Sequence, residues 1–199
     1  EIFEGNKFEG HTMLPVIEAF KEKYQMGQLI VVADAGLMSE KNIMQLLANG
    51  YSFIIGARIK NESQAIQHQI LSIKLRDGQS GEIRKDPIQR IIVSYSVSRA
   101  KNDAHNRTKG FNRLKQLLEK GKLTKKNINN KGYNKYVKLQ GQVTITLDEE
   151  KYLADSKWDG LKGYLTNTTL AKEAVVEYYR QLWHVEKTFR ISKTDLRIR

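Results

Sequence analysis

The sequence predicts an α/β fold, and the evidence is two short apolar segments with a helix between them. Residues 29–33 (LIVVA) and 51–59 (YSFIIGARI) have the composition of buried strands. Between them, residues 39–48 begin with a serine that can cap a helix and are followed by Asn-Gly, which ends one. A strand, a helix and a strand in about thirty residues form a βαβ unit, so we expect the two strands to be parallel.

Periodicity predicts the other elements in order. An amphipathic helix over 12–24 precedes the βαβ unit. The later elements are a strand over 90–98, a basic helix over 106–123, a loop over 125–136, strands over 142–150 and 159–167, and a helix from Thr168 or Thr169 to about Lys193.

Apolar content falls between residues 60 and 157, which indicates an insertion into the α/β core. We therefore expect three segments: residues 1–59 as the first part of the core, residues 60–157 as an inserted, mostly β subdomain with one basic helix, and residues 158–199 as the last core strand and helix.

The formal net charge is +12 and is unevenly distributed. Residues 101–140 hold twelve Lys and Arg against two acidic residues, which gives +10 in that segment alone. A segregated basic charge favours a polyanion partner, usually nucleic acid, and residues 106–138 are the best candidates for DNA contact. The alternative, a solvated basic surface, stays open.

Composition also excludes several classes of site. The chain has no cysteine, so it has neither disulfides nor thiolate metal ligands, which fits a reducing cytosol. No apolar run reaches the roughly 20 residues that span a bilayer. The four histidines lie far apart, with no spacing typical of metal ligands.

Asp34 directly follows the first predicted strand, and small residues, Ala35 and Gly36, come after it. Open α/β sheets bind ligands at the carboxyl ends of their strands, and a carboxylate there can hold Mg²⁺. The alternative is an aspartate that only closes the turn between strand and helix.

The last helix carries two stripes at 100° per residue. One stripe is apolar and suits packing: Leu182, Val185 and Phe189. The other combines aromatic, acidic and basic side chains within about 40° of one line: Tyr179, Trp183, Glu186, Arg190 and Lys193. An ion pair between Glu186 and Arg190 at i, i+4 explains only part of this second stripe.

The pattern Tyr179-x2-Leu182-x3-Glu186-x6-Lys193 resembles the Y-x2-R-x3-E-x6-K signature of insertion-sequence transposases, whose catalytic core is the DDE, RNase H-like domain. Other segments are similar to the same family in the same order: VVADAGL (31–37), YSFIIGARI (51–59), IIVSYSVSRAKND (91–103), GYLTNT (163–168) and LWHVEKTFR (182–190).

The resemblance implies an RNase H-like α/β core with a β-rich insertion before the last core helix. It also implies an Asp, Asp, Glu triad that holds two Mg²⁺ or Mn²⁺ ions for DNA strand cleavage and transfer, with Asp34 and Glu186 as two of its members. Tyr179, Arg190 and Lys193 would then contact DNA phosphates or sugars. Trp183 would either stack on a base or pack in the core.

Two departures from the family pattern limit this interpretation. Leu182 stands where the signature has arginine, and the first aspartate of the triad has no counterpart in this sequence. We therefore expect an N-terminally truncated transposase fragment that is inactive alone. The alternatives are an inactive basic DNA-binding or relic fragment and a stand-alone metal-dependent nuclease. The family further implies a homodimer on paired DNA ends and a bacterial cytoplasmic, nucleoid-associated location.

Overall fold

The computed structural model describes residues 9–36, 39–141 and 144–194, and for residues 9–12, 183 and 185–194 it describes the backbone alone. The chain divides into two compact units. Unit 1 comprises Glu1–Leu75, Ser80–Ser94 and Lys162–Arg199, and unit 2 comprises Arg76–Gln79 and Tyr95–Leu161.

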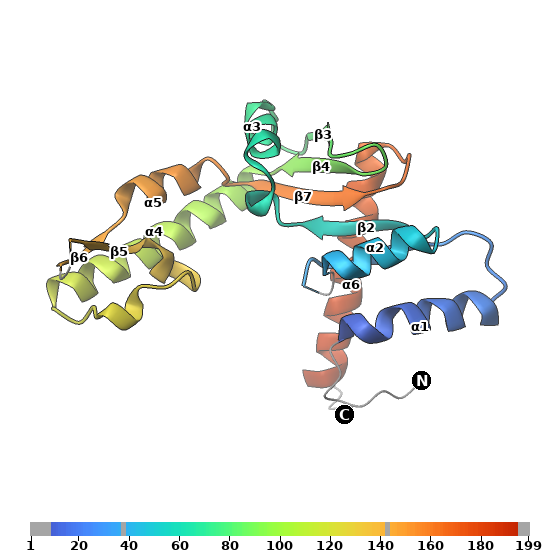
Figure 1. The fold of residues 1–199 in the computed structure, drawn as a ribbon, viewed down its shortest axis with the longest axis horizontal. Helices are drawn as coiled ribbons and strands as arrows, with labels where there is room; N and C mark the ends of the chain where they lie inside the picture. Colours follow the sequence, from blue (N-terminus) through green and yellow to red (C-terminus); the bar gives the residue numbers. More distant parts are fainter. Residues whose placement is uncertain (1–8, 37–38, 142–143, 195–199) are drawn as a thin grey trace. The chain divides into compact units, whose positions relative to one another are not determined.

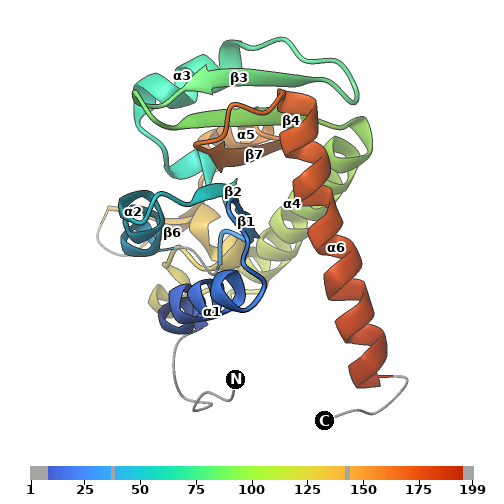
Figure 2. The ribbon, with the colours of Figure 1, turned by 90° about the vertical axis from the view of Figure 1, so that its right-hand side faces the viewer.

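Unit 1 is built on a five-stranded sheet with the strand order β1-β2-β7-β4-β3. Figure 1 labels β2, β7, β4 and β3 in this order, and Figure 2 labels β1 beside β2. Its strands are β1 (Ile30–Ala33), β2 (Ser52–Ala57), β3 (Ser80–Arg84), β4 (Arg90–Tyr95) and β7 (Leu161–Thr166). The sheet is mixed, because β1 and β2 are parallel whereas β7 runs antiparallel to β2, and β3 antiparallel to β4. The predicted parallel pair is therefore confirmed, and the fold is α/β.

The helix between β1 and β2 also matches the prediction. Helix α2 is Glu40–Ala48, and the side chain of Ser39 caps it by accepting a hydrogen bond of 3.2 Å from the Asn42 backbone N–H. A serine in this position satisfies one of the N–H groups that the first helical turn leaves without a partner.

Helices cover both faces of the sheet, with α2 on one side and α6 (Lys172–Thr194) on the other (Figure 2). Side chains alternate across a strand, so Ile54 of β2 joins the core cluster beneath α6. That cluster also contains Ile92, Tyr164, Val175 and Tyr179, all buried. Helix α1 (Glu9–Lys23) and helix α3 (Gln64–Ser72) complete unit 1.

Unit 2 has a core of its own. It contains helix α4 (Val97–Glu119), a hairpin of β5 (Val137–Gln140) and β6 (Thr144–Leu147), and helix α5 (Glu149–Ser156). Its buried residues come from α4 and from the chain leading into the hairpin: Phe111, Leu114, Leu123, Tyr136 and Val137. None of the helices in the described parts of either unit is long and apolar enough to cross a membrane.

The compact units differ from the segments expected from composition. We expected all of residues 60–157 to form the insertion, but β3 and β4 are strands of the core sheet. Burial explains the difference, because Ile91, Ile92 and Val93 of β4 are fully buried, as a strand covered on both faces must be. Unit 2 is also mostly helical rather than mostly β: the strand predicted over 142–150 ends at Leu147, and α5 begins at Glu149.

The end of β7 is tied to β2 by side chains. The Asn167 amide accepts a hydrogen bond of 2.8 Å from the Phe53 backbone N–H and donates one of 2.9 Å to the Tyr51 carbonyl. The Thr166 hydroxyl, which is fully buried, donates to the Phe53 carbonyl at 2.6 Å and accepts from the Thr168 N–H at 3.1 Å. These bonds fix the chain where it leaves the sheet to enter α6.

We predict that Thr166→Val destabilises the protein by about 1–3 kcal/mol, because it leaves a buried carbonyl and a buried N–H without a partner while changing the shape little. Urea denaturation of both variants provides the measurement. Thr169→Val is the matched control, since Thr169 is exposed in the same loop. Equal stability of the two variants would contradict the assigned role of the Thr166 hydroxyl.

Candidate catalytic carboxylate site

Asp34 lies immediately after β1, at the carboxyl end of the parallel pair formed with β2. Its side chain is exposed, whereas Val31 and Ala33 of the strand before it are buried. The loop that follows is held by Arg58, whose guanidinium donates to the Ala35 carbonyl at 3.3 Å. The structure thus presents this carboxylate at the edge of the sheet where the sequence predicts it.

The hydroxyl of Tyr179 donates a hydrogen bond of 2.7 Å to Asp34 Oδ1. Tyr179 belongs to α6 and is only 7% exposed, so its ring packs in the core while its hydroxyl reaches the sheet edge. An edge-to-face contact with Tyr164, at 4.9 Å between ring centroids, fixes the ring. The bond therefore connects the end of β1 to the second turn of α6.

Lys162 on β7 adds a positive charge to this site. Its Nζ lies 4.4 Å from the centroid of the Tyr179 ring and 5.6 Å from that of Tyr164, the range of a cation–π contact. The lysine thus touches the ring whose hydroxyl binds Asp34. Its positive charge also lowers the pKa of the Asp34 carboxyl.

These contacts lower the pKa of the Asp34 carboxyl below its ordinary value. The largest cause is the hydrogen bond from Tyr179, and the backbone N–H groups of Ala35 and Gly36 and the charge of Lys162 act in the same direction. Desolvation opposes them but does not prevail. Asp34 is therefore ionised at neutral pH, which is the state that a divalent cation requires of an oxygen ligand.

Gly56 of β2 leaves the space in which Tyr179 and Asp34 meet. A Cβ at this position would lie 2.6 Å from the Tyr179 hydroxyl and 3.3 Å from Asp34 Oδ1. A real Cβ does not lie 2.6 Å from an oxygen atom, so any larger residue here would require the Tyr179 hydroxyl to shift. Glycine inside a strand usually weakens the strand. At Gly56 the close approach of the Tyr179 side chain explains why a glycine is present.

The other predicted site residues lie farther along α6. Glu186, Arg190 and Lys193 fall within the helix, but their side chains, like that of Trp183, lie outside the described residues. Glu186 follows Tyr179 by seven residues, which is about 10.5 Å along a helix and nearly the same angular position. Its convergence with Asp34, and the contacts of Arg190 and Lys193 with DNA, stay predictions.

Leu182 and Tyr179 have structural roles that the sequence pattern did not show. Leu182 is partly buried and packs against the core cluster beneath α6, which accounts for an apolar residue where the signature has arginine. Tyr179 was expected to contact DNA. That contact stays a prediction, and the structure adds a partner within the protein, Asp34.

Among the side chains that the structure describes, no group of three His, Asp or Glu residues is placed to hold a metal ion. Asp34 fits a divalent cation by its chemistry, because it is ionised and exposed and Tyr179 occupies only one of its oxygens in the bonds described above. Glu186 is the nearest predicted partner along α6.

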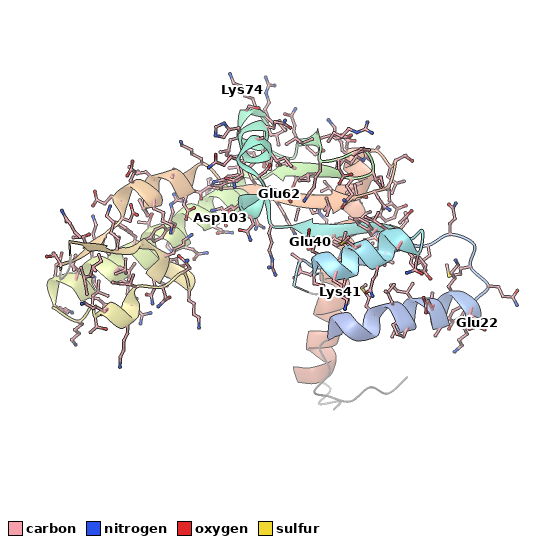
Figure 3. All side chains as sticks on the ribbon, in the orientation of Figure 1. Glu22, Glu40, Lys41, Glu62, Lys74 and Asp103 are labelled. Atoms are coloured by element: carbon pink, nitrogen blue, oxygen red, sulfur yellow. The ribbon has the colours of Figure 1, made fainter. Side chains whose placement is uncertain are left out.

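A cavity of about 390 Å³ lies on the α2 side of the sheet, behind the loop that follows Asp34. Ala35, Gly56 and Arg58 form part of its wall, together with Lys85 and Glu62, the latter shown in Figure 3 beside the start of α3. Lys85 and Glu62 form an ion pair at 2.8 Å, so their charges compensate each other. We assign no ligand to this cavity.

Comparison with known protein families identifies the family of the chain. The family model described as the transposase DDE domain matches residues 1–199. The chain belongs to the transposase DDE domain family. No curated protein and no solved structure matches it. The mixed sheet with helices on both faces is the RNase H-like fold of this family, and the fold class predicted from the sequence is confirmed.

Membership places this DDE domain in DNA transposition and recombination, with DNA as the partner. The family generally uses divalent metal ions. Two residues of the site, Lys162 and Gly56, were not predicted from the sequence. The signal available for Gly56 was a glycine inside an otherwise apolar strand. Lys162 gave no signal, because its position on β7 beside Tyr179 depends on the tertiary fold.

We predict that Tyr179→Phe raises the pKa of the Asp34 carboxyl toward its ordinary value, because the variant lacks the hydrogen bond that lowers it most. Carboxyl ¹³C NMR titration measures this pKa. The pKa is depressed in the folded state, so the bond stabilises the wild-type fold above the unfolded-state pKa and loses its effect as pH falls through the folded-state value. Tyr178→Phe, an exposed neighbour, is the control, and an unchanged Asp34 titration in Tyr179→Phe would contradict the assignment.

Proposed function

We propose that this DDE domain is the part of an insertion-sequence transposase that catalyses metal-dependent DNA strand cleavage and strand transfer at the element ends. One observation carries the proposal: the ionised Asp34 at the end of β1 is bound by Tyr179, and the same helix carries Glu186 two turns further on. Two carboxylates of a metal-binding set would thus come from segments that one hydrogen bond holds together.

In this proposal Asp34 and Glu186 hold the divalent metal, Mg²⁺ or Mn²⁺, with two ions expected in the complete active site. Bound metal supplies Lewis-acid stabilisation of the charge that develops in displacement at phosphorus. Carboxylate oxygens suit these hard cations, which keep several positions open for phosphate oxygens and water.

The surrounding residues orient the Asp34 carboxylate and keep it ionised. Tyr179 orients Asp34 through its hydroxyl, and Gly56 leaves room for that contact. Lys162 helps to keep the carboxylate ionised. Arg190 and Lys193, further along α6, would bind the DNA backbone, since Arg and Lys are the usual phosphate ligands. A second copy of the chain would bind the other element end.

The alternative is a basic DNA-binding fragment without catalytic activity. The basic composition of α4 and of the loop after it favours this alternative, since DNA binding through counterion release does not require a metal site. The two functions differ in one measurable respect, which is cleavage in the presence of Mg²⁺ or Mn²⁺.

We predict that Asp34→Asn and Glu186→Gln each reduce cleavage by about 100-fold or more, because bound metal supplies several kcal/mol of transition-state stabilisation. The assay uses protein produced from its complete open reading frame and a plasmid that carries the DNA flanking the gene, with Mg²⁺ or Mn²⁺. Glu177→Gln, an exposed carboxylate on the same helix, is the control and should cleave normally.

Cleavage that survives both substitutions would exclude the proposed metal site. If the unsubstituted protein bound the plasmid but did not cut it with either metal, the inactive DNA-binding fragment would be the better description.

A further inference from the structure

Helix α4 of unit 2 carries a stripe of polar side chains on its outer face, which we call the α4 stripe. Its residues recur at intervals of four and three, so at 100° per residue they lie within about 40° of one line. The stripe contains three basic residues and three amides: Asn102, Asn106, Lys109, Arg113, Gln116 and Lys120. All six side chains are exposed.

The opposite side of the helix is fully used in packing. Phe111 and Leu114 belong to the core of unit 2, and Phe111 stacks on Tyr152 at 4.3 Å between ring centroids. The ring of Tyr133 covers Gly110 so closely that a Cβ there would lie 2.3 Å from it. The α4 stripe is therefore a free surface of a helix that is already held in place.

The charges of α4 are arranged unequally around the helix. Away from the stripe, Arg99, Arg107 and Lys115 each form an ion pair with a carboxylate. In the part of the chain that the structure describes, no ion pair involves Lys109, Arg113 or Lys120. Among the described residues, four basic side chains of α4 and its C-cap have no ion pair, Lys101, Lys109, Arg113 and Lys120, and three of them lie on the stripe.

The two acidic residues of α4, Asp103 and Glu119, lie off the stripe. Asp103, labelled in Figure 3, accepts a hydrogen bond from the Gly160 N–H at 3.1 Å and pairs with Arg99. Glu119 lies about 100° from Lys120 around the helix. The α4 stripe itself holds positive charge and amides only, although the exposed face of the helix beside it also includes Glu119.

We infer that the α4 stripe is a binding surface for duplex DNA, with Lys109, Arg113 and Lys120 as phosphate contacts. The stripe is about 27 Å long at 1.5 Å per residue, which matches about eight base pairs of duplex. A helix of this kind fits the major groove, which is about 12 Å wide. The three amides add hydrogen-bonding capacity along the same line without adding negative charge.

This inference rests on the proposed function only in taking DNA as the substrate. It assigns duplex binding to a surface of unit 2, whereas the proposed metal site belongs to unit 1. Binding can be measured in EDTA, where the metal site is inactive, so the two proposals can fail separately.

The test compares two triple variants of the full chain that lose the same charge. Lys109→Gln, Arg113→Gln and Lys120→Gln together remove the charge of the stripe. Lys101→Gln, Lys151→Gln and Lys157→Gln together remove exposed lysines of unit 2 outside residues 106–138. Fluorescence anisotropy with a 20-base-pair duplex in EDTA, over a series of salt concentrations, gives the affinity and its salt dependence. Thermal denaturation shows whether each variant is folded.

We predict that the slope of log K against log salt is less steep by about 2.7 in the stripe variant, because each lost phosphate contact contributes about 0.9. The variant should also bind at least about tenfold more weakly at 0.1 M salt. The control variant should lose less than about threefold. Equal losses in both variants would overturn the inference, because the binding would then depend on total charge alone, and so would failure of the unsubstituted chain to bind duplex.

Discussion

The hydrogen bond from Tyr179 to Asp34 joins two parts of the core that lie 145 residues apart in the sequence. Without it, the end of β1 and the start of α6 would be related only by apolar packing, which is non-directional. Together with the packing of Val175 and Leu182 in the core cluster, the bond sets which side of α6 faces the sheet edge. The same helix carries Glu186 two turns further on.

The bond in turn depends on residues that have no chemistry of their own in the site. Gly56 provides the space, and Tyr164 packs against the edge of the Tyr179 ring. Thr166 and Asn167 fasten the chain to β2 just before α6 begins. Their positions follow from the mixed sheet, in which β7 lies next to β2. The insertion of unit 2 between β4 and β7 leaves this arrangement intact, because unit 2 packs around its own core.

The sequence predicted the parts of this structure that local patterns encode. The βαβ unit, the Ser39 cap and the position of Asp34 at a strand end follow from hydrophobic runs and capping chemistry. The assignment of β3 and β4 to the core sheet could not be predicted, because it depends on the pairing of β4 with β7, two strands that are far apart in the sequence. The partnership of Tyr179 with Asp34 was also missed, since a helical stripe indicates which residues share a face but not what that face meets.

The electrostatics of the site explain why Asp34 needs this support. A DNA phosphate that approaches the sheet edge brings negative charge, which by itself raises the pKa of a nearby carboxyl and weakens it as a cation ligand. The Tyr179 hydroxyl and the backbone N–H groups of Ala35 and Gly36 lower the pKa of the Asp34 carboxyl by hydrogen bonds, and the positive charge of Lys162 acts in the same direction. These contacts hold the carboxylate ionised and in a fixed orientation, which is the form in which an oxygen ligand binds a divalent cation.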